Sequence, residues 1–125
     1  MPGSDATTLA PDGVLAGEKF HGAYTWASWF LRRMVRETKA LTLPDAIYRL
    51  TSLPARRLGL ENRRRIAQGC HADIVVLDWN RYSERGSVDN PSQLAQGVEH
   101  VMVNGVFTLA NGQVTGERAG RIVRY

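Results

Sequence analysis

The sequence predicts an α+β fold in which helices come first and a small antiparallel sheet follows. Apolar residues recur at helical spacing over residues 24–39, which is typical of an amphipathic helix. Residues 72–78 form a short, β-branched and almost continuously apolar run, as in a buried strand. Two Asn-Gly pairs, Asn104-Gly105 and Asn111-Gly112, each stand between short β-rich runs and predict two-residue hairpin turns.

The long helix predicted over residues 24–39 has an apolar and a polar side. The polar side carries Arg32, Arg33, Arg36 and Glu37, and Trp29 falls near the border. An aromatic-rich stripe at this spacing favours packing in a core or an interface over the binding of a cofactor. The stripe consists of Trp26, Ala27, Phe30, Leu31, Met34 and Val35.

Two short helices are predicted next, and each has a start signal. Thr42 is suited to cap the first helix, with a proline in its first turn and Asp45 at the third position of a capping box. Ser52 is expected to cap the second helix over residues 53–58, which Gly59 ends. The inward face of the first helix is expected to hold Leu43, Ala46, Ile47 and Leu50.

The predicted sheet begins with residues 72–78, which we expect to be buried on both faces. Residues 79–93 are polar and without a clear period, which predicts a long surface loop. The tail then has the pattern of a β-meander. Its strands are predicted at residues 98–103, 106–109 and 113–115, with residues 122–123 as a candidate last strand.

Composition narrows the class of protein. A single cysteine, Cys70, excludes an internal disulfide, and its lack of a second cysteine nearby favours a turn residue over a metal or redox site. No apolar run approaches the roughly 20 residues of a membrane span. The first residues also lack the charged-then-apolar pattern of a signal peptide. We therefore expect a cytoplasmic protein that does not bind a membrane.

The net charge of +4 raises the question of nucleic-acid binding. The densest cationic point is the run Arg63-Arg64-Arg65. A phosphate-binding surface needs cations gathered on one face, often with aromatic residues between them. Because the arginines are spread over helix faces, a turn and the tail, we expect no nucleic-acid partner and interpret them as a solvated surface.

Several motifs in this order resemble the C-terminal segment of amidohydrolase-superfamily enzymes, and among them the N-acyl-D-amino-acid deacylases (D-aminoacylases). The central motifs are T-S-L-P-A-R at residues 51–56 and G-x-x-A-D-I-V-V-L-D at residues 69–78. Upstream, Gly3-Ser4-Asp5 and L-A-P-D-G at residues 9–13 are similar to the end of the last barrel strand in that family. Downstream, V-x-x-V-x-V-N-G at residues 98–105 and G-x-x-x-G-R at residues 116–121 are similar to its closing hairpins and tail.

The resemblance implies a C-terminal fragment of a (β/α)8-barrel amidohydrolase. A complete barrel takes about 250 residues, and this chain has 125. Residues 1–60 would be the end of the barrel domain, with its last strand, loop and terminal helices. Residues 61–125 would be a portion of the family's C-terminal β-sandwich, whose other strands come from the N-terminal end of the full polypeptide.

The resemblance also implies a catalytic role for Asp5. It matches the aspartate at the end of the eighth barrel strand, which lies beside the metal, takes a proton from the hydrolytic water and passes it to the leaving amine. Within the isolated chain, an aspartate in a Ser-Asp turn is the alternative interpretation. The parent enzyme is expected to bind zinc, with Asp5 as a metal ligand only in the context of a full barrel, and the isolated chain is expected to bind no cofactor.

His21 is the weaker site prediction. Family members place a histidine in this loop near the substrate, followed in the D-aminoacylases by an arginine that holds the substrate carboxylate. Here His21 is followed by Gly-Ala-Tyr, without an arginine in that position. The sequence therefore leaves open whether the substrate is a D-amino-acid derivative. The metal-binding His-x-His motif of the family does not occur in the chain, and His71 and His100 lie too far along to replace it.

Two functions follow, from different classes. The first is the C-terminal region of a metal-dependent amidohydrolase acting on the amide C–N bond of N-acyl-D-amino acids or related small amides, inactive as the isolated chain. The second is a small oligomeric binding domain without catalysis. A homo-oligomer is expected, because the helix stripe lacks a barrel to pack on and the sheet edges lack partner strands.

Overall fold

Helices precede the sheet along the chain, as the sequence predicts. The computed structural model describes residues 2–3, 14 and 17–123. The helical part consists of α1 (His21–Leu31), the π-helical turn η1 (Arg32–Glu37), α2 (Leu43–Leu50), α3 (Ser52–Arg57) and the 3-10 turn η2 (Glu61–Arg63). The strands are β1 (Ile74–Leu77), β2 (Val98–Val103), β3 (Val106–Ala110) and β4 (Gln113–Val114). This order confirms the expected α+β class.

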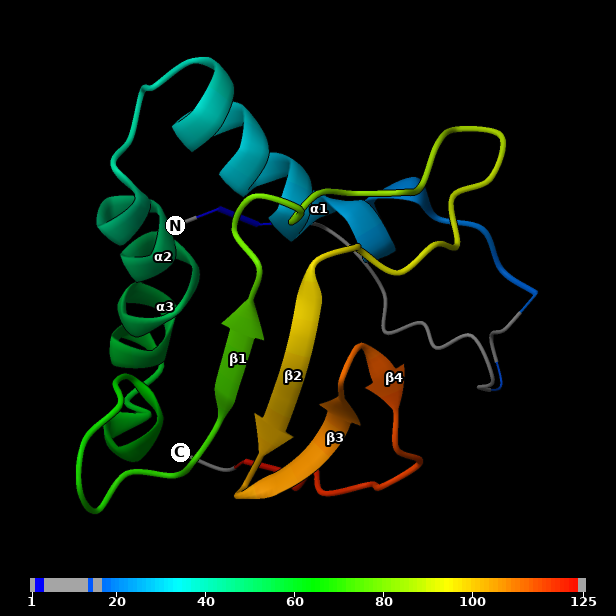
Figure 1. Cartoon of the computed structure of the whole chain (residues 1–125). Coiled ribbons are helices and arrows are strands. Elements are labelled where there is room, and N and C mark those ends of the chain that lie inside the picture. Colours follow the sequence, from blue (N-terminus) through cyan, green and yellow to red (C-terminus); the bar gives the residue numbers. More distant parts are fainter. Residues whose placement is uncertain (1, 4–13, 15–16, 124–125) are drawn as a thin grey trace.

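The strands form one antiparallel sheet in chain order, β1-β2-β3-β4. Ile74 pairs with Met102, and the register shifts between Val76 and Leu77. In Figure 1, α2 and α3 stand beside β1 on the side away from β2, and α1 crosses the end of the sheet where β1 finishes. None of the helices among the described residues is long and apolar enough to cross a membrane.

Both predicted hairpin turns are present. Asn104 and Asn111 have φ of 49° and 52°, and each following glycine is also left-handed. Positive φ at both central residues is the geometry of a type I′ turn, which asparagine and glycine tolerate better than other residues. The two Asn-Gly pairs thereby set the registers of β2 on β3 and of β3 on β4.

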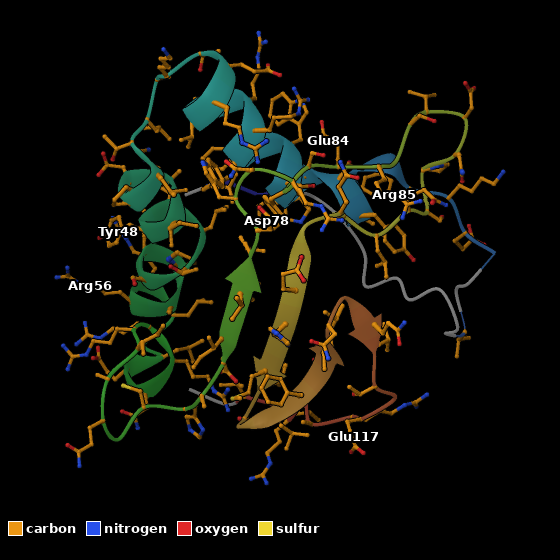
Figure 2. The ribbon with its side chains drawn as sticks, in the orientation of Figure 1. Tyr48, Arg56, Asp78, Glu84, Arg85 and Glu117 are labelled. Atoms are coloured by element: carbon orange, nitrogen blue, oxygen red, sulfur yellow. The ribbon has the colours of Figure 1, made fainter. Side chains whose placement is uncertain are left out.

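The start of α2 is the capping box predicted from its sequence. The hydroxyl of Thr42 accepts from the N–H of Asp45 at 3.3 Å and donates to the Asp45 carboxylate at 2.6 Å. Ala46 is fully buried on the inward face, whereas Tyr48 is 44% exposed. Figure 2 shows Tyr48 and Arg56 on the side of α2 and α3 that faces away from the sheet.

The predicted cap of α3 is wrong. Ser52 is the first helical residue, and its hydroxyl donates to the carbonyl of Arg64 instead of capping the helix. The reason is that α2 runs into α3 through one residue, Thr51, which ends the first helix and begins the second. The predicted end is correct, since Gly59 has φ of 69° and the N–H of Leu60 bonds the carbonyl of Ala55.

The predicted stripe is confirmed in part. Leu31 is 2% exposed and Phe30 and Val35 pack against the core. The other buried residues of α1 are the small polar Thr25 and Ser28, and Trp29, predicted near the border, is 48% exposed. A close approach explains this choice, because a Cβ at Gly86 would lie 2.8 Å from the Thr25 side chain. Small residues therefore let the segment after β1 lie directly on the helix.

Two predictions about strands are corrected. Val75 and Val76 of β1 are 56% and 46% exposed, so β1 is not buried on both faces among the described residues. Residues 122–123 are not part of a strand.

The core lies where α1, α2 and the segment following β1 meet. Its buried hydrophobic members among the described residues are Leu31, Ala46 and Tyr82. Tyr82 belongs to the stretch predicted as a polar surface loop, and a bridge between Ser83 and Gln96 closes that stretch. This stretch is thus partly inside the protein, because Tyr82 packs in the core with Leu31 and Ala46.

Candidate functional site

A cleft of about 490 Å³ lies between α2, the arginine run and β1. Its apolar walls include Ile47 of α2, Ile66 after the arginine run, and Ile74, Val75 and Leu77 of β1. Its polar lining comes from Thr51, Ser52, Arg63, Arg64, Arg65, His71 and Asp73. We call this site the basic cleft, because three arginines and a histidine face a single carboxylate.

One end of the basic cleft is fixed by a network around Asp73. One oxygen of its carboxylate pairs with Arg63, and the other accepts from the backbone N–H of Asn104 at 2.8 Å. Arg63 also donates to the side-chain oxygen of Asn104 at 2.5 Å. The amide of Asn104 reaches the carbonyl of Ala119 at 2.7 Å. The network therefore joins η2, the start of β1, the β2–β3 turn and the tail.

The electrostatics of this network favour the ionised carboxylate. Burial acts to raise the pKa of Asp73, but the Asn104 N–H and the Arg63 guanidinium outweigh it and hold the pKa below its ordinary value. His71 adds a smaller effect in the same direction. The charge of Arg63 is thus satisfied within the protein.

Arg64 and Arg65 are less completely paired. Arg64 forms an ion pair with Glu61 at 2.8 Å, and that glutamate side chain is 63% exposed. The Nε of Arg64 is buried without a hydrogen-bond partner among the described residues. Arg65 is exposed and makes no ion pair within the described part of the chain. The basic cleft therefore has an excess of positive charge.

A second cluster holds the segment after β1 against η1. Arg36 donates to the backbone carbonyls of Trp79 and Tyr82, and its guanidinium lies 4.4 Å from the centre of the Trp79 ring. Arg32 forms a salt bridge with Glu84. Both arginines were predicted to be solvated, and the long-range partners that hold them are 43 to 52 residues away in sequence.

Of the two predicted site residues, the structure describes the backbone of His21 and not Asp5. Asp5 lies outside the described residues. His21 is the first residue of α1 rather than part of a preceding loop. The prediction that both lie at a substrate therefore stays a prediction.

The described residues contain no group of three or more His, Cys, Asp or Glu side chains that could hold a metal ion. His100 accepts from the N–H of Asn111 at 3.3 Å and packs on Phe107. Cys70 is half-buried in the turn before β1. These side chains do not fit a zinc site, and no catalytic step through a metal follows from them.

Sequence reasoning missed the basic cleft and the Asp73 network. Asp73 and Asn104 come together because β1 pairs antiparallel with β2, so the start of one strand meets the end of the other. The signals available were the aspartate directly before a strand and the asparagine opening a hairpin. Neither motif predicts that β1 pairs with β2, which is what brings the two residues together.

Comparison with known proteins gives a consistent result. Residues 8–109 match the model of the amidohydrolase family. The chain is 38% identical to N-acyl-D-glutamate deacylase of Alcaligenes xylosoxydans xylosoxydans over 124 residues, which cover 99% of this chain and 24% of that protein. It is 36% identical to N-acyl-D-aspartate deacylase of the same organism, over 94% of this chain and 24% of the relative.

Solved structures agree. A D-aminoacylase mutant in complex with copper chloride superimposes with a TM-score of 0.75 and 28% identity, covering 79% of this chain and 21% of that chain. N-acyl-D-glutamate deacylase from Bordetella bronchiseptica, complexed with zinc and a phosphonate inhibitor, superimposes with a TM-score of 0.60 and 36% identity. The match covers 66% of this chain and 19% of that chain. The chain thus spans about a quarter of the length of the curated relatives that it matches.

Proposed function

Because this chain belongs to the amidohydrolase family, we propose that it forms the C-terminal part of a metal-dependent enzyme that hydrolyses the amide C–N bond of N-acyl-D-amino acids. The observation that carries the proposal is the 38% identity to N-acyl-D-glutamate deacylase, which runs over 99% of the chain. In this proposal residues 1–60 end a barrel domain, and residues 61–125 form part of a β-sandwich.

The chemical contribution of the chain is assigned to Asp5. A carboxylate beside the reacting amide accepts a proton from the attacking water and returns it to the nitrogen of the leaving amine. His21 is assigned to contact with the substrate, at the beginning of α1. Asp5 is assigned as a zinc ligand in the context of the full barrel, and the other zinc ligands are assigned to the polypeptide outside this chain, since the described residues provide no group that could hold the ion. Bound zinc supplies a Lewis acid for the amide carbonyl in enzymes of this kind.

A second candidate function is a self-associating interaction domain, and one observation favours it. Several large apolar side chains of the sheet are exposed among the described residues, with Val75 at 56%, Val76 at 46% and Phe107 at 46%. Burial of such side chains in a contact between molecules is favourable. We propose that the chain, when alone, covers part of this surface with further copies of itself.

An assay of the isolated chain tests whether its active site depends on further polypeptide. We expect it to show no hydrolysis of N-acetyl-D-glutamate with added Zn²⁺ and no tight zinc binding, because a closed site needs several ligands. Activity would be followed by release of free amine, and zinc by calorimetry. Turnover by the chain alone that disappears in Asp5→Ala would contradict the division of the active site between this chain and further polypeptide.

A further inference from the structure

The two hairpin turns of the sheet share a dipeptide that can react with itself. Asn104-Gly105 joins β2 to β3, and Asn111-Gly112 joins β3 to β4. In such a pair the backbone nitrogen of glycine can attack the side-chain carbonyl carbon of asparagine, because glycine has no Cβ to hinder the approach. The two copies of the dipeptide lie in different surroundings, so the structure decides which of them reacts.

The reaction is deamidation, and water is its only co-reactant. A bond forms between the glycine nitrogen and the side-chain carbon, the bond from that carbon to the amide nitrogen breaks, and ammonia leaves with the proton of the glycine N–H. Water then opens the resulting succinimide ring at either carbonyl. The product is an aspartate or an isoaspartate, whose main chain is longer by the former Cβ.

The reacting groups at Asn104 are held in place. The side-chain oxygen of Asn104 accepts from Arg63 at 2.5 Å, and its amide nitrogen donates to the carbonyl of Ala119 at 2.7 Å. The N–H of Gly105 donates to the carbonyl of Ala72 at 3.0 Å. Attack requires the side-chain carbon and the glycine nitrogen to approach each other, and these bonds restrain both. The turn between β2 and β3 is therefore protected.

The side chain of Asn111 lacks this restraint. It is exposed and makes no hydrogen bond within the part of the chain that the structure describes, where the bond to His100 comes from the backbone N–H. The nitrogen of Gly112 is held by the carbonyl of Glu99 at 2.9 Å, so the reaction needs the turn to open locally. Its second strand, β4, has two residues, both exposed, at the edge of the sheet. Short exposed elements of this kind open at a low free-energy cost.

We propose that Asn111 is a site of spontaneous deamidation in the folded protein and that the bonds of Asn104 protect the other turn. The inference goes beyond the proposed function and does not depend on it. Deamidation places a carboxylate in the turn between β3 and β4. Isoaspartate also lengthens the main chain of a turn whose two central residues set the pairing of its strands. The modification should therefore loosen β4.

The test follows both asparagines in one sample. The whole chain is incubated in mildly alkaline buffer, and its peptides are mapped over time by mass spectrometry with electron-transfer fragmentation, which distinguishes isoaspartate from aspartate. A parallel sample in concentrated urea is the reference, because there neither dipeptide is restrained by the fold. Amide hydrogen exchange of Thr115, whose N–H donates to the carbonyl of Thr108 at 3.0 Å, reports on the pairing of β4.

In the folded chain we expect Asn111 to deamidate at least about tenfold faster than Asn104, because the side-chain hydrogen bonds of Asn104 must be given up. In urea the two rates should become similar. Arg63→Met removes one of these bonds and should speed the reaction of Asn104 without changing that of Asn111. Arg57→Met, at an exposed arginine of α3, should change neither rate. After deamidation the Thr115 amide should exchange faster.

Equal rates in the folded chain, or a faster reaction at Asn104, would overturn the proposal. An Asn111 that reacts in urea and stays intact in the folded chain would also overturn it. A slower reaction of Asn104 in a folded Arg63→Met variant would mean that the guanidinium activates the carbonyl instead of restraining it. The comparison with urea needs no variant, so it holds even where Arg63→Met does not fold.

These measurements follow the chain itself and no substrate. Their failure is therefore distinguishable from failure of the proposed enzymatic function.

Discussion

The Nε of Arg32 donates to both carboxylate oxygens of Glu84 at 3.0 Å, across 52 residues of sequence. The Glu84 side chain is only 15% exposed. Figure 2 shows Glu84 beside α1, on the segment that follows β1. The pair therefore fastens this segment to the helical layer, next to the buried Tyr82.

Replacing Glu84 by glutamine should lower the free energy of unfolding by about 1–3 kcal/mol, because a partly buried guanidinium loses its charged acceptor. Urea melts at pH 7 measure this change. Arg33→Ala is the control, since Arg33 is 52% exposed and, within the part of the chain that the structure describes, pairs only with Glu37. Its effect should stay within about 0.5 kcal/mol, and equal effects of the two substitutions would contradict the role of the pair.

The same pair should make stability depend on acid. The hydrogen bond from Arg32 lowers the pKa of Glu84 below its ordinary value of 4.5, although burial opposes it. A carboxyl with a lowered folded-state pKa contributes fully above 4.5, and this contribution is lost as the pH falls through the lowered pKa. Below pH 4.5 the free energy of unfolding should therefore fall more steeply for the natural chain than for Glu84→Gln. Parallel curves would show that Glu84 is not the group responsible.

Leu31 should be the most costly leucine to truncate on the helices. It is 2% exposed at the centre of the core, so Leu31→Ala should cost about 2–5 kcal/mol. Leu94 is a matched control at 48% exposure, and its replacement by alanine should cost about 1 kcal/mol or less. Thermal melts followed by circular dichroism compare them. A larger effect at Leu94 would mean that the core is misplaced.

Features specified by a few adjacent residues could be predicted from the sequence, and features that depend on contacts between distant residues could not. The Thr42 cap and both Asn-Gly turns are confirmed because a few adjacent residues specify them. The burial of Tyr82 was missed, since it depends on packing against α1 and α2, far away in sequence. The π-helical turn over residues 32–37 was also missed, because nothing in its sequence distinguishes it from an α-helix. The β-branched run of β1 predicted two covered faces, and the described residues cover it incompletely.

The candidate site was likewise predictable only where short motifs specify it. The basic cleft could not be predicted, because it exists only where α2 and the arginine run come beside β1. Asp5 was predicted from a resemblance, and it lies outside the described residues. The family itself was recognisable from the order of short motifs, and the match over residues 8–109 confirms it.

The two hairpin asparagines should differ in their importance. Both have a left-handed backbone, which costs about 1–2 kcal/mol in other residues. Asn104 in addition bonds Arg63 and the carbonyl of Ala119 through its side chain. Asn104→Ala should therefore destabilise the protein by about 1 kcal/mol or more beyond Asn111→Ala, as measured by urea melts. Equal losses would mean that the side-chain contacts of Asn104 contribute nothing.

The isolated chain should self-associate. Apolar side chains of β1 such as Val75 and Val76 are exposed among the described residues, and contact between copies would cover them. Light scattering over a dilution series should show a mass above 13.9 kDa that falls on dilution. A cooperatively unfolding monomer at micromolar concentration would contradict this expectation.

We propose above that this chain supplies the C-terminal part of an N-acyl-D-amino-acid deacylase. The direct test is a chimera in which residues 1–125 replace the matching quarter of the Alcaligenes N-acyl-D-glutamate deacylase. Its hydrolysis of N-acetyl-D-glutamate is measured. We expect the chimera to hydrolyse the substrate, to lose this activity on Asp5→Ala and to keep it on Glu117→Ala, a change at an exposed residue of the tail. A folded chimera that holds zinc and shows no turnover, or one in which Asp5→Ala has no effect, would contradict it.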